Sequence, residues 1–197
     1  MLSNELVHKG GNMKTNYSSK EEIFTKAKEI VYREGVSNLS MRKLAGECYL
    51  ALGTLYHYFD SKEDLVVYII EDFWKNHFKS CYKANEQLGF KEVFKRFYDV
   101  AYSAYGEFEN IFSNVKVVGA KSLLIKGKEK EQKFMLKLRD FLCGVAKKDP
   151  NVKHEVFDDD FALEEFVSML LDIVILSLDD HRDIKNYILA LISKTIY

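Results

Sequence analysis

The sequence has few residues of the kinds that interrupt or cross-link a chain. It holds one proline, Pro150, and three cysteines among 197 residues. A single proline leaves long helices unbroken, and an odd number of scattered cysteines does not form a disulfide framework. No apolar run approaches the roughly 18 residues of a membrane span, and the N-terminus has no secretory signal. We therefore expect a cytoplasmic protein with reduced thiols and no membrane partner.

Strong net charge and the usual signatures of catalysis are also missing. A formal net charge of -1 excludes a protein coated in basic residues, although a local basic surface is enough to meet DNA phosphates. There is no glycine-rich phosphate loop and no nucleophile accompanied by a base and an orienting group. His77 and Cys81 are one helical turn apart, but no third metal ligand accompanies them. We expect neither an enzyme, nor a cofactor, nor a metal site.

Helical periodicity runs through most of the chain. An apolar content of 47% provides a sizeable core, and the spacing of the apolar residues predicts an all-α fold of about nine helices. We predict a flexible N-terminal arm (1–17), a three-helix helix-turn-helix domain (18–63), and a larger helical bundle for ligand binding and dimerisation (64–197). Within the bundle, the pattern predicts separate helices over 91–104 and 107–114.

The segment from Ser40 to Leu65 is the most informative. Ser40 is a good N-cap for a short helix, a turn follows near residues 49–51, and a second short helix, LGTLYHYF, begins at Leu52. Two short helices joined by a tight turn form a helix-turn-helix, which places its second helix, called here the reading helix, in the major groove of DNA. Arg42 can form two hydrogen bonds with a guanine edge, and Thr54 offers a hydroxyl and a methyl to a base. The candidate DNA-binding residues are Ser40, Arg42, Leu52, Gly53, Thr54, Tyr56, His57 and Lys62.

The same segment is similar to a known family. The matching residues are Ala27, Gly35, Ser40-Met41, Leu44-Ala45, Gly53-Thr54-Leu55-Tyr56, Tyr58-Phe59 and Ser61-Lys62-Glu63-Asp64-Leu65. In order and spacing, residues 23–65 resemble the DNA-binding domain of the tetracycline-repressor (TetR) family. The resemblance implies that Ser40, Tyr56 and Lys62 contact the DNA backbone. It also implies that Arg42, Thr54 and His57 lie near bases.

Three positions depart from the family pattern. Tyr49 stands where the family has a glycine in the turn, and Ala51 stands where a polar residue commonly opens the reading helix. Leu52 occupies a position that is often lysine or another polar residue. Leu52 makes an apolar base contact or lowers the affinity for DNA; the sequence leaves both open.

The last two predicted helices carry more apolar residues than one small core needs. Helix-turn-helix proteins usually pair, so that two reading helices lie one DNA turn apart, and the resemblance implies a four-helix dimer interface. The candidate interface residues are Met169, Leu170, Ile173, Val174, Leu178, Tyr187, Ile188 and Leu191. The alternative is that these residues form only a core within the chain.

Aromatic residues crowd the middle of the chain, and most of them are expected in the core. Pockets between bundle helices are typically apolar with a few polar groups. The candidate ligand-binding residues are Trp74, Phe78, Tyr98, Tyr102 and Tyr105.

The predicted function is therefore that of a dimeric transcriptional repressor, which a small apolar or aromatic effector releases from a palindromic double-stranded DNA operator. Two alternatives remain open. One is a helical ligand-binding protein whose reading helix has degenerated at Tyr49, Ala51 and Leu52. The other is a regulator controlled by a protein partner.

Overall fold

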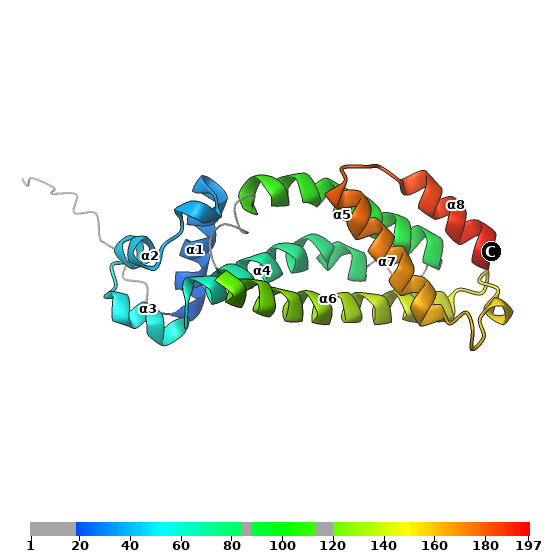
Figure 1. Cartoon of the computed structure of the whole chain (residues 1–197), viewed down its shortest axis with the longest axis horizontal. Coiled ribbons are helices and arrows are strands. Elements are labelled where there is room, and N and C mark those ends of the chain that lie inside the picture. The colour runs from blue at the N-terminus through cyan, green and yellow to red at the C-terminus, as the bar shows by residue number, and fades with distance from the viewer. Residues whose placement is uncertain (1–18, 84–87, 113–119) are drawn as a thin grey trace, which may run out of the picture.

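The computed structural model describes residues 19–83, 88–112 and 120–197. Within these ranges the chain is all-helical, with eight α-helices, two 3-10 helices and no strand (Figure 1). In chain order the elements are α1 (Lys20–Glu34), η1 (Val36–Asn38), α2 (Met41–Cys48), α3 (Leu52–Tyr58), α4 (Lys62–Lys83), α5 (Phe90–Phe112), α6 (Ala120–Lys148), η2 (His154–Val156), α7 (Leu163–Asp179) and α8 (Lys185–Ile196). The predicted arm of residues 1–17 lies outside the described residues.

Helices α1, α2 and α3 gather at one end of an elongated molecule, around an N-terminal core to which α4 and α5 also contribute (Figure 1). Local capping sets the ends of α1. The Ser19 hydroxyl accepts the Glu22 N–H and the Glu22 carboxylate accepts the Ser19 N–H, which forms a capping box. At the other end, Gly35 has φ +82° and donates its N–H to the Val31 carbonyl. Both ends of α1 therefore depend on neighbouring residues alone.

Helix α4 belongs to both halves of the molecule. Its first half contributes Leu65, Val66, Ile69 and Phe73 to the N-terminal core, and its second half packs against α5 and α6. Trp74 packs against both cores. The predicted domain boundary at residues 63 and 64 thus falls at the start of a helix that is shared between the two cores.

The prediction of two helices over 91–104 and 107–114 is wrong for the described residues, since α5 runs without a break from Phe90 to Phe112. No proline interrupts it, and a side chain at Gly106 would meet no atom within 4 Å. Ala104 and Phe112 lie on one buried face that packs against the N-terminal core. This contact with residues far away in the sequence stabilises a continuous helix where the local sequence favoured a break. The described chain therefore has eight α-helices, against about nine predicted.

Asp149 is buried at the end of the molecule farthest from α3, where it joins the start of α5 to the C-terminal residue. Its carboxylate accepts the Phe90 N–H at the start of α5, at 2.8 Å, and the hydroxyl of Tyr197. Gly89 permits this approach, because a Cβ there would lie 2.5 Å from the carboxylate. Burial opposes ionisation of Asp149, but hydrogen bonds from Tyr197, Asn151 and Phe90 outweigh it and lower the pKa of the carboxyl.

Candidate nucleic-acid interface

Helix α3 forms at the predicted position and holds one face to the core. Leu55 and Phe59 are buried in the N-terminal core, four residues apart, so the opposite face points outward. On that face Gly53, Tyr56 and His57 are exposed, while Thr54 is half-buried. Figure 1 shows α2 and α3 at the end of the molecule farthest from α8. The reading helix is thus intact, and three of its predicted contact residues, Gly53, Tyr56 and His57, are exposed.

Gly53 has no structural reason to be glycine. It lies in a helix, and a Cβ added to it would meet no atom within 4 Å. Glycine destabilises a helix interior by about 0.5–1 kcal/mol relative to alanine. The missing side chain instead leaves the backbone of the first turn of α3 open to close approach from outside.

Serine side chains cap the starts of α2 and α4, the two helices that flank α3 in the sequence. The Ser40 hydroxyl accepts the Lys43 N–H and caps α2, and the Ser61 hydroxyl accepts the Asp64 N–H at the start of α4. Lys62 follows directly, and partial burial lowers the pKa of its ammonium group. Helix N-termini carry partial positive charge, which favours phosphate.

An ion-pair network fixes α2 to the end of α1. Glu34 contacts Lys43 and Arg33, and Arg33 also contacts Glu47 at 3.1 Å. The hydrogen bond from Lys43, followed by that from Arg33, lowers the pKa of Glu34. Arg42, next to Lys43, is exposed and forms no ion pair with any described residue. The network includes Lys43 but not Arg42, so the guanidinium of Arg42 remains available for a ligand.

The turn between α2 and α3 contains a strained residue. Tyr49 has φ +57° and ψ +39°, the left-handed conformation that glycine adopts most easily. Its N–H bonds the Ala45 and Gly46 carbonyls. The turn therefore keeps a left-handed residue even though a tyrosine stands in it. Leu52, the other unusual residue, is half-buried and packs against the N-terminal core.

The structure divides the predicted dimer residues into two groups. Leu170, Val174, Leu178 and Ile188 are buried in the core of the chain itself, which is the burial expected from the alternative of an intrachain core. Met169, Tyr187 and Leu191 are exposed, and Ile173 is half-buried. Helical spacing could not separate the two groups, because α7 is apolar around most of its circumference.

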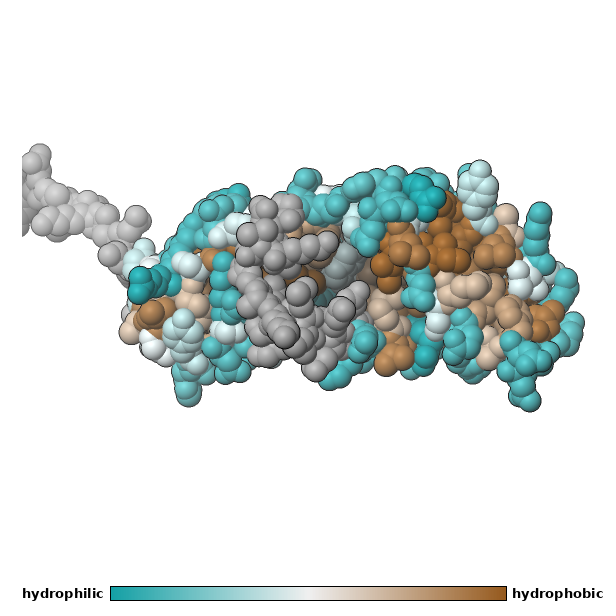
Figure 2. Space-filling view, in the orientation of Figure 1, coloured by the Kyte–Doolittle hydropathy of each residue, from teal (hydrophilic) through white to brown (hydrophobic). Residues whose placement is uncertain are grey.

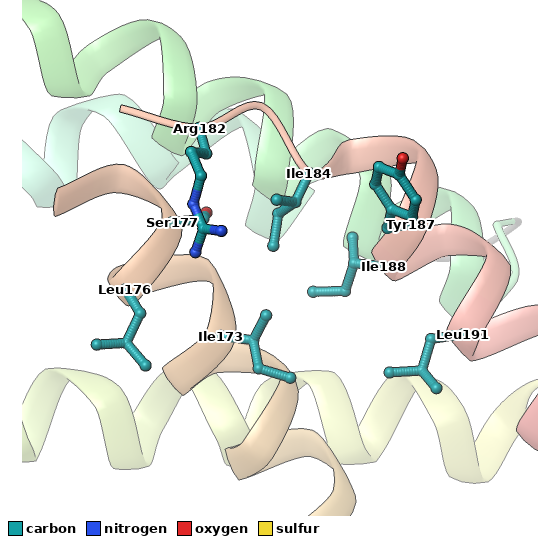
Figure 3. Close-up of a pocket in the computed structure, with 8 residues that line it drawn as sticks. All are labelled: Ile173, Leu176, Ser177, Arg182, Ile184, Tyr187, Ile188 and Leu191. Carbon is teal, nitrogen blue, oxygen red and sulfur yellow. The ribbon is translucent and has the colours of Figure 1, made fainter. Parts of the chain in front are cut away.

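The sequence missed Leu176, which is 62% exposed on α7. It lines a hollow of about 380 Å³ between α7 and α8, to which the loop joining these helices also contributes. Figure 3 shows Ile173 on one side of this hollow and Ile184, Ile188 and Leu191 on the other, with the guanidinium of Arg182 near Ser177. Figure 2 shows apolar side chains gathered over α7 and α8 on this face.

The five predicted ligand-binding residues do not converge on one cavity among the described residues. Trp74 stacks on Phe78 at 5.7 Å between ring centroids, and Tyr98 stacks on Tyr102 at 5.9 Å. Neither pair lines the hollow between α7 and α8.

The hydroxyl groups of two of these tyrosines have partners within the chain. The Tyr98 hydroxyl donates to Asp183 and accepts the Ile184 N–H, and the Tyr105 hydroxyl donates to Asp179. Burial, followed by Asp179, raises the pKa of Tyr105. These residues hold the loop between α7 and α8 against α5.

The fold and the exposed reading helix define a helix-turn-helix DNA-binding protein. Residues 23–69 match the model of the bacterial regulatory proteins of the tetR family. An HTH-type transcriptional regulator from Staphylococcus aureus strain USA300 is 41% identical over 69 residues, which is 34% of this chain and 36% of that protein. The match to these curated relatives thus spans about a third of their length.

Solved structures extend the likeness over most of the chain. A TetR-family transcriptional regulator from Vibrio parahaemolyticus is 25% identical, with a TM-score of 0.53 over 90% of this chain and 97% of that one. A transcriptional regulator from Cytophaga hutchinsonii is 16% identical, has a TM-score of 0.61 over 89% and 97% of the two chains, and shares the fold. Residues 23–69 thus form a DNA-binding domain of the TetR family, and the chain shares its fold with a TetR-family transcriptional regulator over 90% of its length. None of the helices within the described ranges is long and apolar enough to cross a membrane.

Proposed function

We propose that this protein is a dimeric repressor that binds a palindromic operator through α3 and leaves it when a small apolar or aromatic molecule binds the helical body. The observation that carries the DNA-binding part is Gly53, whose open backbone lies on the exposed face of α3 beside Tyr56 and His57. Gly46 and Gly106 are equally open and exposed; Gly53 is distinguished by its place on the outward face of the predicted reading helix, where glycine lets a ligand approach the backbone closely.

The other predicted contacts support the same orientation. Arg42 is exposed without an ion-pair partner among the described residues and is suited to a guanine edge. Tyr56 is 49% exposed and can donate its hydroxyl to a phosphate. Ser40 and Lys62, at the starts of α2 and α4, are suited to two further phosphates.

The distribution of exposed apolar residues supports a dimer through the last helices. In the described part of the chain, every exposed large aliphatic side chain lies on α6, α7 or α8: Leu136, Met169, Leu176 and Leu191. Large exposed apolar patches mark interaction sites. A two-fold dimer through this surface would present two α3 helices to the two halves of a palindrome.

The effector response rests on α4, which connects the two cores. Its Trp74 packs against both of them and stacks on Phe78. A small apolar or aromatic molecule that separates these two rings would shift α4, whose first residue is Lys62. Such a molecule must bind the released state more tightly than the DNA-bound state. Because Trp74 is the one tryptophan of the chain, its fluorescence reports this event directly.

The experiment begins with selection of bound duplexes from a random pool, followed by affinity measurements on the selected site. Gly53→Ala is expected to stabilise the fold by about 0.5–1 kcal/mol and to weaken operator binding roughly tenfold or more, because the added methyl group meets the duplex. Gly106→Ala is the matched control. Its Cβ also meets no atom within 4 Å, but it lies in α5.

Three results would contradict the proposal. The selected pool could lack a palindrome, binding could be independent of salt, or Gly53→Ala could bind as tightly as Gly106→Ala. Salt-independent behaviour is what a ligand carrier with a degenerate reading helix would show, since phosphate contacts make binding fall with salt. A screen of hydrophobic compounds that neither quenches Trp74 nor releases the duplex would contradict the effector response alone.

A further inference from the structure

A second hollow lies on the other side of α7, between α7 and α6. It measures about 350 Å³ and is lined by Met135 and Leu136 of α6 and by Leu171 of α7, together with polar groups that include Gln132 and Asp172. Leu136 is 48% exposed. This hollow has hydrogen-bonding side chains on both walls, with Gln132 and Arg139 on α6 and Ser168 and Asp172 on α7.

The spacing of residues in α7 places the two hollows on opposite flanks of one ridge. Leu171 and Asp172 line the hollow toward α6, whereas Ile173 and Ser177 line the hollow toward α8. With 3.6 residues per turn, these pairs lie to either side of the exposed stripe that carries Met169. The face therefore presents, in order, α6, a hollow, the α7 ridge, a second hollow, and α8.

We propose that the hollow between α6 and α7 receives Tyr187 from α8 of a second copy of this chain. The inference rests on the proposed dimer. A two-fold contact is isologous, so each copy offers its partner the same ridges and hollows. An axis that seats the partner's α7 in the hollow between α7 and α8 places the partner's α8 one helix spacing further along the face. That position is the hollow between α6 and α7, and the same holds for the other copy.

The chemistry of Tyr187 matches this seat. It is 80% exposed, more than any other large hydrophobic side chain in the described part of the chain. A tyrosine has an apolar ring and a polar tip, and the hollow offers Met135 and Leu136 to the ring and Gln132 and Asp172 to the hydroxyl. Tyrosine and methionine are enriched where protein interfaces are buried.

Sedimentation equilibrium of the full-length chain tests the pairing through Leu136→Ala, Tyr187→Ala and the double variant. Each single change is expected to raise the dimer dissociation constant roughly tenfold. The double variant should raise the dissociation constant by clearly less than the product of the two single effects, because both changes remove the same contact. Both side chains are largely exposed in the single chain, and circular dichroism melts check that the variants stay folded. Lys137→Ala, exposed on α6 and not lining the hollow, should leave the constant unchanged.

Leu176→Glu, on the ridge itself, separates this inference from the dimer proposal. If Leu176→Glu abolishes a dimer that Leu136→Ala and Tyr187→Ala leave intact, the dimer stands and the seat of Tyr187 is wrong. Effects of the two alanine variants that simply multiply would also overturn the pairing. If the unmodified chain is a monomer at every concentration, the dimer proposal fails and this inference fails with it.

Discussion

Glycine in place of Tyr49 should leave the protein more stable than alanine in the same place. Tyr49 ends α2 with φ +57°, and its N–H bonds the carbonyls that close the turn into α3. The turn therefore depends on this backbone conformation. Among the described residues, His181 is the one other non-glycine residue with positive φ.

The size of the effect follows from two opposing terms. The left-handed conformation costs an ordinary L-residue about 1–2 kcal/mol. Glycine avoids this cost but loses about 0.5–1 kcal/mol more backbone entropy on folding. Comparing Tyr49→Gly with Tyr49→Ala removes the ring from both sides of the comparison. The glycine variant should then be more stable than the alanine variant by about 0.5–1 kcal/mol, which corresponds to about 1–4 °C in melting temperature for a chain of this size.

Thermal and urea denaturation at one fixed protein concentration measure this difference, because association would otherwise shift the transition. His181→Gly compared with His181→Ala is the matched control, and it should show a difference of the same sign at the loop before α8. The reasoning is refuted if Tyr49→Gly is no more stable than Tyr49→Ala. That result would mean that the native turn does not hold residue 49 in the left-handed region.

Three further changes test other parts of the fold. Tyr98→Phe should lower the free energy of unfolding by about 1–3 kcal/mol, because it leaves the Ile184 N–H without its acceptor; a melting curve equal to that of the unmodified chain would contradict this. Stability should fall with acid below about pH 4, as the lowered pKa of Asp149 is crossed, and should fall with alkali between about pH 10 and 12, because the pKa of Tyr197 is raised to about 12 and its neutral form is favoured on folding. In urea titrations at several pH values, Asp149→Asn should reduce the fall in the free energy of unfolding that acid causes. Ala51→Ser should stabilise α3 by about 0.5–2 kcal/mol, since the helix has no side-chain cap, and an unchanged urea midpoint would speak against it.

Local signals in the sequence were enough for the helix-turn-helix. The structure confirms the predicted cap at Ser40, and the caps at Ser19 and Gly35 likewise depend on residues at most four positions apart. The buried positions Leu55 and Phe59 also follow from helical spacing alone. The roles of the eight DNA-contact residues remain predictions. The structure adds that Gly53 is not required for packing and that Arg42 is left without an ion-pair partner among the described residues.

The helical body depended on contacts that the sequence does not display. Leu170 and Leu176 lie on the same apolar helix, yet one is buried and the other is 62% exposed, because neighbouring helices cover only part of α7. Helix α5 continues to Phe112 because its last turns pack against a core built from the first half of the chain. The carboxylate of Asp149 meets the start of α5 across 59 residues of sequence.

The sequence alone thus determined the helical class, the ends of the short helices and the residues on the reading face, because caps, turns and helical periodicity act over a few neighbouring residues. Tertiary structure alone decided which apolar side chains of α6, α7 and α8 remain outside and where the two hollows beside α7 lie. Those features depend on which helix surfaces meet, and that is settled by packing between segments far apart in the chain.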